Sequence, residues 1–409
     1  MTKVDAIIAS TIPASQRQFR RKVFYIPGYD PIHPRRYREL YRKEGREQAV
    51  VSGYALKLLP KSDKGGYGWR VEGMIDGNAT ATEVEVLVWS DIVRNSMATG
   101  IVATYLQLIR TVWAYVGSGA LFRLMRLRKG PMIAALYPIG VLIVQLVAAL
   151  LAGWLMFRAG ALLHPILGAA LGLVVIPTVL GWFCTHDNRI FAYYLMHDYA
   201  YSAQFHGANP PELEARMAEF RATIADALRP DCDEVLIVGH SSGAHLGVSI
   251  LADLMRAGLP PEAPALSFLT LGQVVPMVSF LPGARRLRGD LHYLSARKEI
   301  TWVDVTAPGD GCAFALCDPV CVTGVAPLNK CWPLVISAAF TQTLSPERWR
   351  ALRWRFFRLH FQYLCAFDRP GDYDYFRITA GAQTLAQRYR DRPASKSRIE
   401  TPLSPYRTL

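Results

Sequence analysis

A stretch of almost uncharged sequence limits what this chain can fold into more than any other feature. Between Lys129 and Asp187 the only formally charged residue is Arg158. Residues 132–157 and 161–184 are apolar runs of 26 and 24 residues. As α-helices they would be about 39 and 36 Å long, enough to cross a ~30 Å hydrocarbon core. We therefore predict a hairpin of two membrane-spanning helices, joined by a tight turn at residues 158–160.

The charges that flank this hairpin predict its orientation. The predicted turn offers only Arg158, whereas four basic residues precede the hairpin: Arg123, Arg126, Arg128 and Lys129. Because cytoplasmic flanks carry the excess of lysine and arginine, we expect both ends of the hairpin, and both chain termini, in the cytoplasm. The N-terminus has too short an apolar core for a secretory signal. Residues 100–122 include Gln107 and Arg110, which favours a helix lying at the membrane interface over a third span.

Composition narrows the possible classes of protein. Hydrophobic residues make up 51% of the chain, charged residues 19%, and the mean hydropathy is +0.14, which excludes a disordered protein. The net charge of +13 suits an anionic membrane surface, and no nucleic-acid-binding motif accompanies it. Seven cysteines do not form a typical disulfide framework, and the cluster Cys312, Cys317, Cys321 and Cys331 fits no zinc spacing. Neither a metal nor an organic cofactor is predicted.

Outside the hairpin, strand patterns alternate with helical ones. Residues 211–228 place apolar side chains at spacings of three and four, which is typical of an amphipathic helix, and residues 242–257 are a second predicted helix. Strands are expected at residues 21–26, 51–59, 67–76, 83–89, 234–238, 265–271 and 300–305. The second and third of these would form an antiparallel pair. The alternation predicts an α/β fold with a mostly parallel sheet flanked by helices.

This pattern divides the chain into four parts. Residues 1–98 would supply the first strands, residues 99–189 the interfacial helix and the hairpin, and residues 190–390 the remainder of the sheet. Residues 391–409, rich in proline, serine and arginine, are expected to form a loose basic tail. Because strands on both sides of the hairpin must join one sheet, the number of spans must be even.

The sharpest local motif is Gly-His-Ser-Ser-Gly at residues 239–243. It follows the predicted strand 234–238 directly and opens a predicted helix, which is the context of a nucleophile elbow. There a serine, here Ser241, occupies a strained turn that exposes its hydroxyl, and the flanking glycines leave room for that turn. The helix N-terminus would offer the backbone N–H of Ser242 to a developing oxyanion.

On these residues the chain resembles the α/β-hydrolase superfamily, in its lipase and esterase branch, with the membrane hairpin as an insertion. The resemblance implies Ser241 as nucleophile and an acid followed by a histidine further along the chain. It also implies an oxyanion hole formed by the N–H of Ser242 and an N–H from a loop after an early strand. The matching loop is residues 27–31, where Tyr29 or Gly28 would supply that group. This loop departs from the usual His-Gly start.

The order that the resemblance implies, serine, then acid, then histidine, selects the histidine. His245 lies on the elbow helix and is expected to be structural, and His292 precedes the best acids. His360 remains as the general base. It lies in residues 345–363, predicted as one helix that begins with a Ser-Pro-Glu cap. Arginines alternate there with Trp and Phe, which is typical either of a helix on anionic headgroups or of a basic face above a buried aromatic one.

The loop that follows the strand at residues 300–305 supplies the candidate acid. Asp310 stands in a Pro/Gly-rich segment, at the distance after the strand that the resemblance implies for the acid. Its role would be to orient His360. Asp318 is the rival, and Asp304, inside the strand, is the third choice. Each of them is also compatible with a plain turn-forming or structural aspartate.

Four functions remain in competition. The leading hypothesis is a membrane-anchored serine hydrolase that cleaves an acyl ester, plausibly lipid-like, through a Ser-His-Asp triad and an acyl-enzyme. Acyl transfer to an alcohol on the same fold is the second, and a catalytically silent membrane scaffold is the third. Nucleic-acid binding is a distant fourth. The expected partners are the lipid bilayer and a small-molecule or lipid ester, and the oligomeric state is left open.

Overall fold

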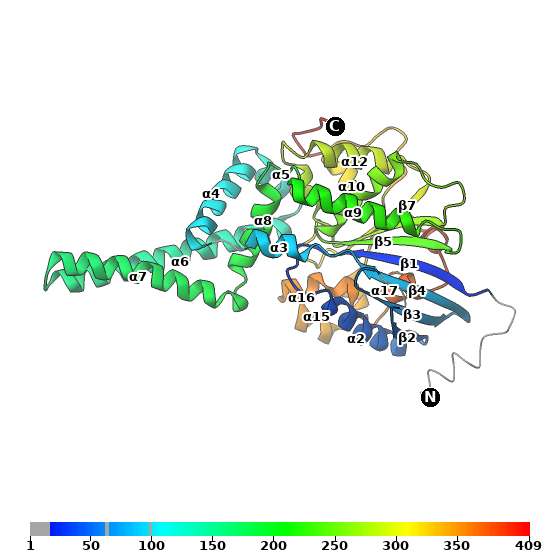
Figure 1. The fold of residues 1–409 in the computed structure, drawn as a ribbon, viewed down its shortest axis with the longest axis horizontal. Coiled ribbons are helices and arrows are strands. Elements are labelled where there is room, and N and C mark those ends of the chain that lie inside the picture. Colours follow the sequence, from blue (N-terminus) through cyan, green and yellow to red (C-terminus); the bar gives the residue numbers. More distant parts are fainter. Residues whose placement is uncertain (1–16, 62–64, 98–99) are drawn as a thin grey trace.

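An eight-stranded sheet forms the centre of the molecule (Figure 1). The computed structural model describes residues 17–61, 65–97 and 100–409. The N-terminal segment that is predicted to lack a secretory signal lies outside these residues. The strand order is β2-β3-β4-β1-β5-β6-β7-β8, and only β3 runs against the others. The strands are β1 (Phe19–Ile26), β2 (Ala55–Pro60), β3 (Gly68–Ile75), β4 (Asn78–Val86), β5 (Glu234–His240), β6 (Ala265–Leu271), β7 (Ile300–Thr306) and β8 (Leu334–Ser337).

The predicted mostly parallel α/β fold is confirmed, and so is the antiparallel pair. The second predicted strand begins late, because residues 51 and 52 end a helix, α2 (Arg35–Ser52), that the sequence analysis missed. Strand β8 was also missed. It has four residues, too few to show a clear alternation.

Helices cover both faces of the sheet (Figure 1). On one face lie α9 (Pro211–Ala227), α10 (Gly243–Arg256) and α12 (Arg285–Ser295), and on the other α2, α15 (Pro346–Leu352), α16 (Phe356–His360) and α17 (Tyr375–Ala380). The buried residues of α9 occupy the predicted spacing: Leu213, Met217, Phe220 and Ile224. The shorter elements are α11 (Val275–Ser279), α13 (Pro319–Thr323), α14 (Phe340–Thr343), α18 (Leu385–Arg388) and η2 (Gln362–Leu364).

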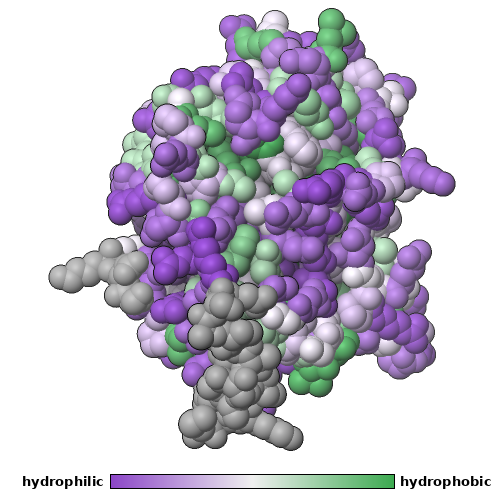
Figure 2. All heavy atoms as spheres, turned by 90° about the vertical axis from the view of Figure 1, so that its right-hand side faces the viewer, coloured by the Kyte–Doolittle hydropathy of each residue, from purple (hydrophilic) through white to green (hydrophobic). Residues whose placement is uncertain are grey.

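A helical insertion separates β4 from β5. It comprises α3 (Ser90–Met97), α4 (Ile101–Gly117), α5 (Ala120–Leu127), α6 (Lys129–Ala161), α7 (Pro165–Thr185), η1 (Asp187–Arg189) and α8 (Ala192–Ala203). Helices α6 and α7 pair and project far beyond the sheet, whereas α4, α5 and α8 lie at their base (Figure 1). Both projecting helices are long and apolar enough to cross a membrane. The opposite end of the molecule carries mainly hydrophilic residues (Figure 2).

The turn of this hairpin lies later than predicted. Helix α6 continues through residues 158–160, and the chain turns at residues 162–164. Arg158 and Ala159 are compatible with a helix, and Gly160 packs closely against Gly168 of α7, leaving no room for a Cβ atom. Pro165, at the first turn of α7, fixes where the second helix begins.

Two predictions for the C-terminal region were wrong. The single helix expected over residues 345–363 is divided: α15 ends at Leu352 and α16 begins at Phe356, because the exposed residues 353–355 between them have no buried face to stabilise a continuous helix. Ser345 does cap α15 as expected. The tail at 391–409 is not loose: the N–H of Ile399 donates to the carbonyl of Leu316 at 2.7 Å, and Arg288 donates to the carbonyl of Thr408. Leu316 lies in the loop between β7 and α13, and Arg288 lies in α12, so both are distant from the tail in sequence.

Asp304 should make the fold less stable as the pH rises from 3.8 to about 8. Burial raises the pKa of this carboxyl from 3.8 to about 8, although Thr270 donates a hydrogen bond to it. Between these two values the folded protein holds the extra proton, so the free energy of unfolding falls as pH rises, by at most ~1.4 kcal/mol per pH unit. Thermal unfolding midpoints at pH 5 and pH 8 should differ less in Asp304→Asn than in the wild type. If the midpoints shifted equally in the variant and the wild type, the raised pKa of Asp304 would be contradicted.

Candidate active site

Ser241 occupies the turn between β5 and α10 in a left-handed conformation, with φ of 55°. This conformation is unfavourable for a residue with a side chain, and close packing holds it in place. A Cβ atom on Gly243 would lie 2.1 Å from the carbonyl oxygen of Ile26, and one on Gly239 would lie 2.7 Å from that of Gly243. Only glycine fits at both positions, so the local structure is the predicted strand–turn–helix elbow.

The loop after β1 lies directly against this turn. The Cβ position of Gly28 would be 3.0 Å from the Cβ of Ser241 and 3.4 Å from its Oγ. Trp89 holds the loop by donating from Nε1 to the carbonyl of Pro27. In the described parts of the chain, neither the N–H of Tyr29 nor that of Ser242 donates to a protein acceptor. The two amides predicted for the oxyanion hole therefore have no protein acceptor among the described residues, and Tyr29 and Ser242 line the same cavity as Ser241.

Asp310 and His360 form the predicted acid–histidine pair. Nδ1 of His360 lies 2.7 Å from Oδ2 of Asp310. The carboxylate also accepts hydrogen bonds from the hydroxyl of Tyr363, at 3.0 Å, and the N–H of Cys312, at 2.9 Å. Burial alone would raise the pKa of Asp310, but the charge of His360 and these hydrogen bonds lower it below its ordinary value. The acid is thus ionised at neutral pH and keeps the histidine oriented.

The rival acids have structural roles. Asp318 caps α13 by accepting from the N–H groups of Val320 and Cys321, and it pairs with Lys330 at 2.8 Å. Asp304 is bonded to Thr270 inside the sheet. Neither carboxyl is bonded to His360, and the structure therefore selects Asp310 among the three.

Two further residues support the histidine and were not predicted. Nε2 of His240, the residue before the nucleophile, lies 3.0 Å from the carbonyl oxygen of His360 and donates to it. Burial lowers the pKa of His240 to about 3, so its ring is neutral. Tyr363 is buried and bonds the acid. The sequence motif contained His240, but only the fold reveals that the ring reaches the segment that carries His360.

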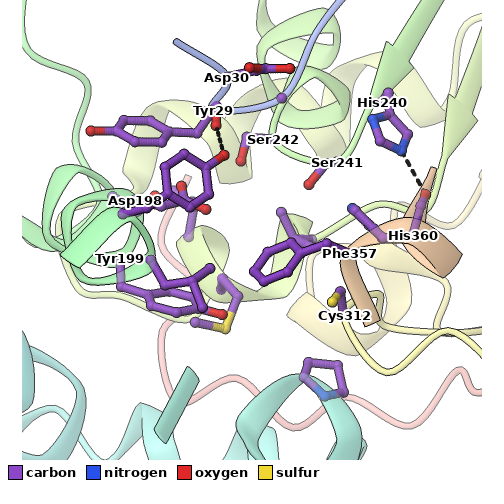
Figure 3. Close-up of a pocket in the computed structure, with 18 of the residues that line it drawn as sticks. Tyr29, Asp30, Asp198, Tyr199, His240, Ser241, Ser242, Cys312, Phe357 and His360 are labelled. Carbon is purple, nitrogen blue, oxygen red and sulfur yellow. Dashed lines mark hydrogen bonds between the residues drawn. The ribbon is translucent and has the colours of Figure 1, made fainter. Parts of the chain in front are cut away.

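A small cavity of about 90 Å³ opens beside these groups. The side chain of Ser241 points into it, and His360 of α16 lines the same side, with Asp198 and Tyr199 across the cavity (Figure 3). The insertion supplies a large part of the wall, through Pro131 at the start of α6 and five residues of α8: Tyr194, Leu195, Asp198, Tyr199 and Ser202. None of these was predicted, because no sequence pattern indicates which face of an inserted helix meets a distant loop.

One of the two clusters of potential metal ligands in the described chain lies at this site, and its hydrogen bonding and protonation do not favour a metal ion. Asp310, Cys312 and His360 have ligand atoms within 4.8 Å of one another, but Nδ1 of His360 is already bonded to the carboxylate. Burial also raises the pKa of the Cys312 thiol well above its ordinary value, so the thiolate that a metal requires is disfavoured. Of the clustered cysteines only Cys317 is fully buried, whereas Cys331 is exposed. His245, predicted to be structural, is buried on α10.

Replacing Asp310 should reduce the nucleophilicity of Ser241 severely. In Asp310→Asn the amide can neither hold the required tautomer of His360 nor stabilise its charged form, so the rate of covalent modification by a fluorophosphonate should fall on the order of 10⁴-fold. Asp318→Asn keeps the helix cap and loses only an ion pair, so its rate should stay within a few-fold of the wild type. A severe loss in Asp318→Asn combined with a mild one in Asp310→Asn would reverse the assignment.

Comparisons with known proteins add no relative to this picture. No protein-family model, no curated protein and no solved structure matches the chain. The chemistry of the site must therefore be inferred from its own residues and geometry.

Proposed function

We propose that this protein is a membrane-anchored serine hydrolase of the α/β-hydrolase type that cleaves an acyl ester. The observation that carries the proposal is the strained Ser241 turn opening on the same cavity as the bonded Asp310–His360 pair. A nucleophile, a base oriented by a carboxylate and free backbone N–H groups are the components of acyl transfer through a covalent intermediate. The membership in that superfamily rests on the resemblance of the motif and on the mostly parallel sheet.

The reaction would proceed in two steps. His360 accepts the proton of the Ser241 hydroxyl while Oγ attacks the ester carbonyl, and Asp310 stabilises the imidazolium that forms. The oxyanion accepts hydrogen bonds from the N–H groups of Tyr29 and Ser242. His360 then protonates the departing alcohol, leaving an acyl-enzyme. Water, activated by His360, attacks that ester, releases the carboxylic acid and restores Ser241.

The hairpin supports membrane anchoring. With 33 and 21 residues, α6 and α7 are about 50 and 32 Å long, and their hydropathic segments are only 22% and 17% buried. A core helix of a soluble protein would be mostly buried, whereas these helices expose rows of large apolar side chains, among them Leu150, Leu155, Leu173 and Val174. A surface of this kind needs an apolar environment.

Two further segments fit the same interface. Residues 353–358 expose Trp354, Phe356 and Phe357 beside three arginines, which favours the interfacial interpretation, although Trp349 of α15 packs against the core. Helix α4 likewise exposes Val102, Ile109 and Trp113. Exposed aromatic and basic side chains together are typical of elements that lie at anionic headgroups.

These elements adjoin the cavity. The Cβ position of Gly130, at the start of α6, lies 3.2 Å from the carbonyl oxygen of Gly311 in the acid loop, and that of Gly311 lies 3.1 Å from the ring of Phe356. The proposed catalytic centre would therefore be close to the bilayer surface, which supports an amphiphilic ester as substrate.

Ser241→Ala should abolish both covalent labelling by a fluorophosphonate and the release of carboxylic acid from a soluble test ester, because the variant lacks the hydroxyl on which the acyl-enzyme would form. Ser242→Ala is the control, since it keeps the backbone N–H and should still be labelled. Labelling of Ser241→Ala at the wild-type rate would overturn the assignment of the nucleophile.

Cysteine accessibility tests the proposed topology. Leu162, at the hairpin turn, is 87% exposed, and Ser397, in the C-terminal tail, is also exposed. In intact cells an impermeant thiol reagent should label Leu162→Cys and not Ser397→Cys, with the parent chain giving the background of its own free thiols. Labelling of Ser397→Cys together with protection of Leu162→Cys would exclude a cytoplasmic catalytic domain.

A further inference from the structure

Among the described residues of the cavity wall, Asp198 is the one carboxyl that has neither a bonded partner nor a role in the proposed mechanism. It belongs to α8, within the insertion, and lines the same cavity as Ser241 and His360. Figure 3 shows it on the side of the cavity opposite His360, between Tyr29 and Tyr199. No hydrogen bond or ion pair of its side chain occurs among the described residues.

The groups around Asp198 do not compensate its charge. The cavity lining includes no lysine or arginine among the described residues. The neighbouring Tyr194 donates its hydroxyl to the carbonyl of Tyr29 at 2.5 Å, and the hydroxyl of Tyr29 is paired with Ser96 at 2.6 Å. The second cavity carboxylate, Asp30, is already bonded by Arg36 and Tyr37.

These surroundings raise the pKa of Asp198. Burial raises the pKa of this carboxyl from 3.8 to about 7, and the charge of His360 lowers it only in part. A carboxylate at such a site is costly to keep ionised without a partner. The remaining titratable groups that interact with it are Tyr29, Tyr115, Tyr194, Tyr199 and Cys312, and none of them supplies a positive charge.

We propose that Asp198 binds an ammonium group of the substrate, so that the esters cleaved at Ser241 carry an amine or a quaternary ammonium. The proposal rests on the proposed function and names its substrate class. The missing positive charge would come from the ligand, and tyrosine rings beside the carboxylate would add cation–π attraction. An anionic group would instead be repelled here.

The rest of the cavity favours an organic cation over a metal ion. Calcium and magnesium take six or more oxygen ligands, whereas Asp198 is the only unpaired carboxylate of the described lining. Aromatic side chains form much of the wall: the centroids of Tyr29 and Tyr194 are 6.3 Å apart, and those of Tyr194 and Phe357 are also 6.3 Å apart. A cavity of about 90 Å³ takes a compact group of this kind.

Paired substrates test the proposal. Acetylthiocholine carries a quaternary ammonium, and S-(3,3-dimethylbutyl) thioacetate replaces its nitrogen by carbon at the same shape. In the wild type kcat/KM should be at least tenfold higher for the cationic ester. In Asp198→Asn, which keeps the size and removes the charge, the ratio should fall to about one. Glu262→Gln removes an exposed carboxylate away from the cavity and should keep the wild-type ratio.

A wild-type ratio near one, or a ratio that Asp198→Asn leaves unchanged, would overturn the proposal. If the substitution merely disturbed the structure, both esters would lose turnover together and the ratio would persist. The ratio therefore distinguishes recognition of the charge from general damage.

Binding without catalysis separates this proposal from the proposed function. Full-length Ser241→Ala in a neutral detergent should bind tetramethylammonium in equilibrium dialysis, and addition of Asp198→Asn should weaken that binding at least tenfold. Equal binding by the two variants, or none by either, would refute the ammonium site. If this binding depends on Asp198 but the wild-type protein is not labelled by any fluorophosphonate, the ammonium site would be supported and the hydrolase refuted.

Discussion

The contact between the β1 loop and the β5–α10 turn is the constraint on which the rest of the site depends. The backbone of Gly243 lies so close to Ile26 that no side chain fits, and Gly28 lies against Ser241. This packing holds Ser241 in its left-handed conformation and places the loop of Gly28 and Tyr29 beside it. Two strands that are more than 200 residues apart in sequence thereby build the turn that carries Ser241.

Parallel pairing explains why the other groups arrive at the same place. β5, β6 and β7 are neighbours and run in the same direction, so the segments after their carboxyl ends meet at one edge of the sheet. Ser241 follows β5 and Asp310 follows β7. The divided helix α15–α16 then brings His360 to within hydrogen-bonding distance of Asp310.

Asp310 and Asp198, which both interact with His360, differ in pKa because their surroundings differ. Asp310 accepts three hydrogen bonds and has a lowered pKa, whereas Asp198 has no such donors and its pKa is raised to about 7. The first is suited to orient a base, and the second lacks a cation. That second environment is built by the insertion, which also carries the apolar hairpin, so the segment proposed to anchor the protein also shapes its cavity.

The sequence by itself determined the α/β class and the apolar hairpin and named Ser241, His360 and three candidate acids, because strand and helix periods, glycine spacing and long uncharged runs are local signals. It misplaced the hairpin turn, predicted one helix where there are two, and expected a loose tail. Only the tertiary structure chose Asp310 over Asp318 and revealed His240, Tyr363 and Asp198. Those roles depend on contacts between segments far apart in the chain, and no local pattern encodes which distant surface a side chain will meet.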